Sequence, residues 1–247
     1  MNIESSLAYL DKIPSLHSRS RRSMTDEPDA PLTDSNAGVI GPQLIAFTSG
    51  LDREFKEAVK FSTQMAQRLA DHQFSQVTQR MEWYEAYCTA LKHSGWIGSD
   101  NKLTEYKNSN LEITMEDVAI ELVKLAAGPN AVRIAELVST TVNALKNDGD
   151  VSAKLQASSS SGSSGSFDIL PCIQEGDEVV MYNHSMVFSH SNSAGGLWFW
   201  SWKLSQVSLQ HAANEWTFNY ASYQLVEDKI KEKLGKSSND FFDSINF

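Results

Sequence analysis

Apolar residues recur with a helical period through the first half of the chain. Between residues 51 and 146 they return at spacings of three and four positions, which is typical of helices with one buried face. Helices are expected near 51–69, 79–93, 114–127 and 130–146. Because the connections between them are short, the pattern predicts a compact bundle of about four helices.

The third of these helices has the clearest start. Thr114 is a suitable N-cap, and Glu116 and Asp117 place negative charge in the first turn, where the helix dipole favours it. Ile113 and Val118 have the spacing of a hydrophobic staple. The chain is therefore expected to enter a helix directly after Thr114.

An abrupt change of composition follows the helical pattern. Residues 158–166 read SSSSGSSGS and offer no side chain that could pack in a core, so a flexible linker or an exposed loop is expected there. Residues Ile3–Asp11 could form a short helix, and the residues after it, rich in Pro, Ser and charge, predict little order. The expected organisation is a largely disordered tail over 1–43, a helical part over 44–150, a Ser/Gly linker over 151–166 and an α+β part over 167–247.

Beyond the serine tract the apolar period changes from 3.6 to two. Residues 178–190 and 197–204 both alternate, and the turn-like residues between them suggest a β-hairpin. A loop of odd length would place Trp200 opposite Phe188 and would gather the large apolar groups on one face. We therefore predict a hairpin with this register.

Further strands are expected at 167–173, 207–212 and 216–220, followed by a helix near 220–234. The apolar residues that this helix offers to the sheet are Leu225, Val226, Ile230 and Leu234. The predicted fold class is α+β, with the helical bundle first and then a small antiparallel sheet covered by the C-terminal helix.

The net charge, the first residues and the length of the apolar runs bear on which partners the protein binds and where it is located. A formal charge of −10 argues against general affinity for nucleic acid. Residues 1–16 lack the basic and apolar regions of a cleavable leader, so a cytoplasmic location, or export without a cleavable signal peptide, is expected. No apolar run reaches the roughly 18 residues of a membrane-spanning helix.

Motifs for catalysis and cofactor binding are missing from the sequence. It contains neither a phosphate-binding glycine loop nor a serine nucleophile elbow, and it has no paired zinc-ligand motif. No cofactor and no metal are therefore expected. His184 and His190 share a strand face but are separated by roughly 20 Å, although His211 could approach His184 from a neighbouring strand. Cys172 is a candidate reactive or acylated thiol, with a partly buried, inert thiol as the alternative.

The most unusual local feature is a group of aromatic residues in the C-terminal part. We take five of these residues as the candidate binding or interface surface: Trp198, Phe199, Trp200, Trp202 and Trp216. The alternative is that most of these rings form the core of the sheet under the final helix. One helix hardly covers two aromatic faces, so the excess predicts an interface with a ligand, with lipid or with another chain.

Five segments resemble a group of uncharacterised bacterial and fungal proteins. They are residues 47–50, 58–70, 83–87, 95–97 and 223–234, which include the sequences Trp-Tyr-Glu-Ala-Tyr and Gly-Trp-Ile. The resemblance covers most of residues 45–245 and carries no activity. It implies one family unit in which the serine tract is an insertion between halves that fold together.

Three functions follow as hypotheses. The first is a non-enzymatic binding or self-assembly protein that uses the aromatic surface, as a homo-oligomer or with a protein or lipid partner. The second is a bacterial host-directed or antagonistic factor, a virulence factor or toxin, that acts at membranes. The third is an enzyme whose site is assembled from residues distant in sequence.

Overall fold

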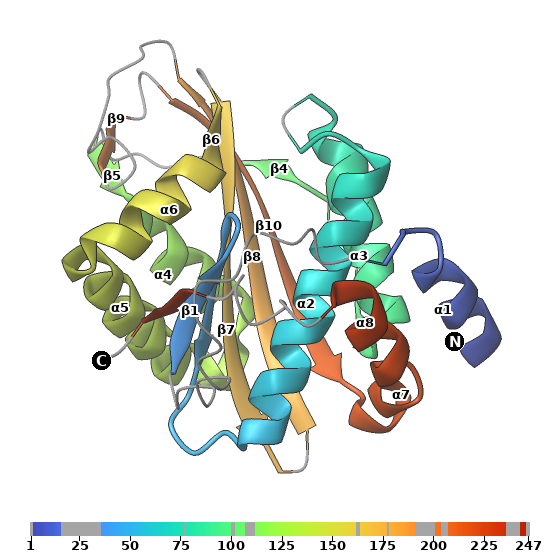
Figure 1. Cartoon of the computed structure of the whole chain (residues 1–247). Coiled ribbons are helices and arrows are strands. Elements are labelled where there is room, and N and C mark those ends of the chain that lie inside the picture. The colour runs from blue at the N-terminus through green and yellow to red at the C-terminus, as the bar shows by residue number, and fades with distance from the viewer. Residues whose placement is uncertain are drawn as a thin grey trace, which may run out of the picture.

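Helices lie on both faces of one mixed β-sheet in the computed structural model (Figure 1). The part of the chain that the structure describes is residues 2–15, 36–76, 78–99, 102–106, 112–161, 164–176, 178–190, 201–203, 207–235 and 243–245. The mixture of helices and strands confirms the α+β class.

The sheet is built around three long strands that are neighbours in the order β7, β8, β10. Its strands are β1 (Ala37–Ile40), β2 (Gln43–Phe47), β3 (Trp96–Gly98), β4 (Thr104–Glu105), β6 (Ser160–Ser161), β7 (Ser164–Glu175), β8 (Glu178–His190), β10 (Val207–Phe218) and β11 (Asp243–Ile245). The order across the sheet is β11-β1-β2-β7-β8-β10-β3, with β4 on β10 and β6 on β7. All of these pairs are antiparallel except β2 with β7, which is parallel. A separate pair joins β5 (Glu112–Thr114) to β9 (Ser201–Lys203).

The helices divide between the two faces of the sheet (Figure 1). One face carries α1 (Ile3–Leu10), α2 (Arg53–Gln73), α3 (Arg80–His93), α7 (Tyr220–Gln224) and α8 (Glu227–Leu234). The other face carries α4 (Met115–Ala126), α5 (Ala131–Asn147) and α6 (Gly149–Ser159), with the short 3-10 helix η1 (Gly128–Asn130) between α4 and α5. Two apolar cores therefore lie on either side of the sheet.

This arrangement corrects the predicted four-helix bundle. The four expected helices do form, as α2, α3, α4 and α5, but α2 and α3 are separated from α4 and α5 by the sheet. The reason lies in strand alternation: Met181 of β8 packs in the core of α2 and α3, whereas Tyr182 packs in the core of α4 and α5. Since both faces of the strand are apolar, helices are needed on both.

Two strands form within or beside the expected N-terminal tail. All residues of β1 and β2 are buried, and the two strands pair through a turn in which Gly41 has a positive φ of 54°. The continuous apolar runs explain this burial, because a strand covered on both faces needs no alternation. The expectation of a largely disordered tail is therefore corrected for Ala37–Ile40, which form β1, whereas the short helix considered at Ile3–Asp11 forms as α1.

The expected Ser/Gly linker is also corrected by the described residues. α6 continues to Ser159, and Ser164 already belongs to β7. Gly165 is needed there because a Cβ would lie 2.2 Å from the carbonyl oxygen of Ser159 and 2.5 Å from the ring of Phe188. Small residues in the tract thus allow a close approach of helix, strand and ring.

The predicted hairpin pairing is wrong. Both edges of β8 are occupied by other strands, so that Phe188 lies opposite Gly165 of β7 and Leu209 of β10. Trp202 lies in β9, opposite Ile113 of β5. Trp198, Phe199 and Trp200 lie outside the described residues.

Other local predictions are confirmed. Thr114 caps α4 in a capping box: its Oγ1 accepts from the backbone N–H of Asp117 at 3.0 Å, and the Asp117 carboxylate accepts from the N–H of Thr114 at 3.1 Å. The predicted strand 167–173 is part of β7, and β10 joins two predicted strands into one. The final helix is divided into α7 and α8, which leaves Leu225 between them 61% exposed instead of on the sheet.

Candidate functional site

A pocket of about 390 Å³ lies between helices and strands that are far apart in the sequence. Its walls come from α1, the end of α3, the residues 95–98 that lead through β3, and the segment 219–226 around α7. We call this cavity the α1–α7 pocket.

Two glycines allow the walls of the α1–α7 pocket to approach one another. Gly95 ends α3 with a φ of 96°, and a Cβ there would lie 2.8 Å from the Cβ of Tyr223 in α7. A Cβ at Gly98 would lie 2.5 Å from the indole of Trp216. The backbone N–H of Asn219 donates to the carbonyl of Gly95 at 2.9 Å. The Gly95 contacts hold α7 against the turn between α3 and β3, and the missing side chain at Gly98 lets β3 approach Trp216 of β10.

Large apolar side chains are exposed around this pocket. Ile3, Ile97 and Leu225 line it and are 38%, 61% and 61% exposed. Among the described residues only two other large apolar side chains are exposed, Met81 and Val132. Three of five such side chains therefore converge on one cavity, whereas isolated exposed apolar residues elsewhere are ordinary.

His93 supplies a polar group to the same cavity. Its ring stacks on Tyr9 with centroids 4.2 Å apart and planes inclined by 15°, and its Nδ1 lies 3.2 Å from the Oγ of Ser6. Burial and then the positive charge of Lys12 lower the pKa of His93 from its ordinary value. Lys92 is a second basic residue in the lining, and the lining residues that the structure describes include no Asp or Glu. The wall is thus apolar with basic groups at α3.

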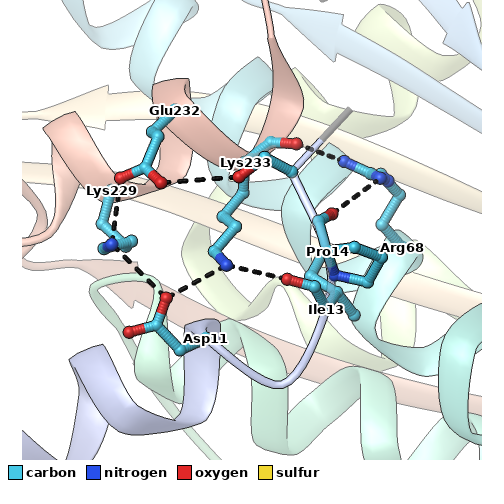
Figure 2. Close-up of polar contacts among 8 residues, drawn as sticks. Asp11, Ile13, Pro14, Arg68, Lys229, Glu232 and Lys233 are labelled. Carbon is cyan, nitrogen blue, oxygen red and sulfur yellow. Dashed lines mark hydrogen bonds and ion pairs between the residues drawn. The ribbon is translucent and has the colours of Figure 1, made fainter. Parts of the chain in front are cut away.

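The wall that α1 forms is fastened at its C-terminal end (Figure 2). Asp11 pairs with Lys229 at 3.3 Å and with Lys233 at 3.0 Å, and the Nζ of Lys233 also donates to the carbonyl of Ile13 at 2.8 Å. Hydrogen bonds from these lysines lower the pKa of Asp11. These contacts join α1 to α8, directly after the α7 residues that line the opposite wall.

Arg68 of α2 adds two bonds to this fastening (Figure 2). Its guanidinium donates to the carbonyl of Lys233 at 2.5 Å and to that of Pro14 at 3.5 Å. Leu10 and Ile13 are buried in the core beside it. The end of α1 is therefore held by apolar packing and by polar bonds together.

The residues expected as an aromatic binding surface lie elsewhere. Trp216 is fully buried in the core of α2 and α3, where its indole covers Gly98, so it presents no accessible surface in this conformation. This corrects its assignment as an interface residue. Trp202 contributes its backbone to the β5–β9 pair, and Trp198, Phe199 and Trp200 lie outside the described part of the chain.

Cys172 lies in the core on the sheet face opposite to His184. It is fully buried, its Sγ contacts the carbonyl of Leu170 at 3.5 Å, and burial raises the pKa of its thiol far above the ordinary value. Cys172 is paired with Met181 in β8, and His184 is three residues further along, on the opposite face. The sheet thus separates Cys172 from His184.

His184 and His211 lie near one another on the face covered by α4. Burial and then the neighbouring His211 lower the pKa of His184 to about 3. Neither ring nitrogen of His184 has a hydrogen-bond partner among the described residues. His211 meets Tyr106 edge to face, with centroids 5.8 Å apart. Within the described ranges, no group of three or more His, Cys, Asp or Glu side chains is arranged to hold a metal ion.

A buried polar row crosses the sheet on the α3 side. Gln43 of β2, Asp168 of β7 and Ser185 of β8 are register neighbours, and the Nε2 of Gln43 donates to Asp168 at 3.1 Å. Burial raises the pKa of Asp168, and its bonds to Gln43 and Ser185 oppose that rise. Asn214 donates to the hydroxyl of Tyr84 nearby. Because these groups are enclosed, the row serves to align strands and not to meet a ligand.

Sequence reasoning missed the α1–α7 pocket. His93, Ile97 and Leu225 are each ordinary in their local pattern, and Leu225 was assigned to the apolar stripe of one long helix. The one signal available was the run Gly-Trp-Ile-Gly at residues 95–98, which places two glycines beside an apolar pair.

Comparisons with known proteins leave the family open. No protein-family model matches the chain, and no curated protein matches it. The solved structure of the Evf virulence factor is similar over 97% of this chain and 92% of its own, with 11% sequence identity and a TM-score of 0.39. A likeness of that size carries no argument about this chain. In the described residues, no helix combines the length and apolar character needed to cross a membrane.

Proposed function

We propose that this is a binding protein that takes up a compact amphipathic molecule in the α1–α7 pocket. The observation that carries the proposal is the convergence of Ile3, Ile97 and Leu225 on one cavity of about 390 Å³. Small-molecule sites are typically concave, largely apolar and supplied with a few polar groups, and they have volumes of about 300–1,000 Å³.

The energetic argument is the burial of exposed apolar surface. An apolar ligand would remove part of Ile97 and Leu225 from water, and each square ångström so buried contributes about 25 cal/mol. Ser6 and His93 then provide polar groups that orient the bound molecule. This combination favours a ligand with both an apolar body and a polar end.

Self-assembly through the aromatic residues stays a separate prediction for Trp198, Phe199 and Trp200. The hypothesis of a host-directed or antagonistic factor acting at membranes stays a prediction as well. Neither has support from a contact among the described residues, so we place the proposed activity in the pocket.

An enzyme alternative arises from the pair Ser6 and His93. Their Oγ–Nδ1 distance of 3.2 Å is within reach of proton transfer. However, Ser6 lies inside α1 and is only 7% exposed, and no described carboxylate orients the other ring nitrogen of His93. We therefore assign the contact to positioning the imidazole. Labelling of Ser6 by a fluorophosphonate probe would contradict this assignment.

The proposal is tested with the full chain and octanol as the probe. We expect Ile97→Asp and Leu225→Asp to weaken octanol binding by about tenfold or more, because a charge in an apolar wall must be desolvated. Val132→Asp is the matched control, since Val132 is 72% exposed on α5, outside the pocket. Calorimetry that finds no octanol binding, or equal binding by all four proteins, would overturn the proposal.

A further inference from the structure

We infer that the molecule bound in the α1–α7 pocket carries an anionic head group, recognised by Lys92 and His93 at the end of α3. The inference rests on the proposed function and adds the charge of the ligand. It depends on three features: the charge of the lining, the charge around it, and the free nitrogen of His93.

The lining is basic in a protein that is acidic. The chain has a formal charge of −10, yet among the described residues the ionisable side chains that line the pocket are Lys92 and His93. A cavity with one sign of charge and apolar walls concentrates the field that attracts the opposite sign. The binding of an anion in this pocket is therefore favoured electrostatically, whereas a cation would be repelled.

Charged groups near the pocket reinforce this asymmetry. The Nζ of Lys12 lies 4.2 Å from the centroid of Tyr9, the ring that stacks on His93. The nearby carboxylate of Asp11 is already paired with Lys229 and Lys233. Glu4 of α1 is exposed and does not line the pocket. Among the described residues, the charged side chain that acts on His93 is therefore the cation Lys12.

His93 has a ring nitrogen available for the head group. Its Nδ1 faces Ser6, and its Nε2 has no hydrogen-bond partner among the described residues. Stacking on Tyr9 fixes the plane of the ring, so the direction of the Nε2 bond is fixed too. An Nε2–H donor and the Lys92 ammonium suit a sulfate, phosphate or carboxylate oxygen.

Three probes that share an octyl chain and differ in head group test the inference on the full chain, at concentrations below those at which they form micelles. They are octyl sulfate, octanol and octyltrimethylammonium. We expect octyl sulfate to bind about tenfold more tightly than octanol, because a hydrogen bond to a charged group contributes enough free energy for that factor. Octyltrimethylammonium should bind most weakly. Octyl sulfate keeps its charge across the pH range used, so only protein groups titrate.

Variants separate the head-group contact from the pocket itself. His93→Gln and Lys92→Met are each expected to reduce the preference for octyl sulfate over octanol while octanol still binds. His72→Gln, on the exposed end of α2, is the control and should keep the full preference. In addition, bound octyl sulfate should raise the pKa of His93 in an NMR titration, and octanol should not.

The outcomes distinguish the two proposals. Equal binding of octyl sulfate and octanol, with no change in the His93 titration, would overturn the anionic head group and leave the pocket standing. Failure of all three probes to bind would overturn the proposed function itself. Tighter binding of the cation would contradict the charge argument directly.

Discussion

The imidazole of His93 stacks face to face on the phenol ring of Tyr9, with centroids 4.2 Å apart. This contact joins the end of α3 to α1, and it lies beside the cavity that both helices line. The C-terminal end of α1 is thus held in two ways, by the aromatic stack of Tyr9 on His93 and by the polar bonds of Asp11.

Replacing Tyr9 with Leu tests the aromatic contact. The variant keeps apolar bulk but loses the stack and the bond from Gln73 Nε2 to the Tyr9 hydroxyl, which is 3.3 Å long. We expect a loss of about 0.5–1.5 kcal/mol in the free energy of unfolding, measured with urea. Hydrogen exchange in α1 should become faster by a larger factor than exchange in β8, whose protection follows global unfolding. Uniformly faster exchange would show that the stack is not local in its effect.

Replacing Lys233 with Met tests the polar fastening. Lys233 is 7% exposed, and its loss leaves the carbonyl of Ile13 without its bond and Asp11 without one partner. We expect the free energy of unfolding to fall by about 1–3 kcal/mol, since an unsatisfied buried acceptor costs this much. Lys231→Met is the control: Lys231 forms an i,i+4 surface pair with Glu227, and its Nζ lies 5.7 Å from the centroid of the Phe61 ring. Methionine keeps an apolar contact with that ring, so stability should change by less than about 0.5 kcal/mol. An equal loss in both variants would contradict the fastening.

The pH dependence of stability should reveal His184. Its pKa falls from 6.5 to about 3 on folding because of burial, so the unfolded state binds more protons between these values. Stability should therefore decrease as pH falls below about 6.5, and His184→Leu should flatten part of this decrease. The exposed His72 gives the matched variant His72→Leu, for which the slope should stay as in the parent protein. A full acid-dependent slope in His184→Leu would contradict the burial of a neutral imidazole.

Substitution at Gly98 tests the close approach of β3 to β10. An alanine Cβ would lie 2.5 Å from the Trp216 indole and 2.7 Å from the carbonyl oxygen of Glu215, and the backbone oxygen cannot turn away. We expect Gly98→Ala to destabilise the fold by about 1–3 kcal/mol in urea unfolding. Gly149→Ala places its Cβ in open space at the start of α6 and should be neutral or slightly stabilising. If Gly98→Ala were also neutral, Trp216 would not be packed as described.

Local elements were predictable because short-range chemistry determines them. The Thr114 cap needs only an acceptor side chain and an acidic residue three positions on, and both are visible in the sequence. Strand alternation likewise identified β8, and strands were expected within β7 and over most of β10. It did not identify partners: the edge of β8 that the hairpin would have used is occupied by β10, and alternation is the same for either pairing.

The layers and the pocket depend on contacts across long sequence distances. Val39 and Ile45 are buried because β2 adds to β7 in parallel, a pairing that no local pattern encodes. The pocket needs Ile3, His93 and Leu225 to meet, and their local patterns are those of ordinary helices. Only the glycines at 95 and 98 signal that the chain passes close to another segment there.

The central claim is tested most directly by mapping octanol onto the full chain by NMR of isoleucine, leucine, valine and methionine methyl groups. The account predicts concentration-dependent shifts at Ile3, Ile97 and Leu225, with saturation, and no shifts at Met81 and Val132, which are also exposed but lie outside the pocket. Shifts of the same size at Met81 and Val132, or the absence of saturable shifts at the pocket, would contradict it.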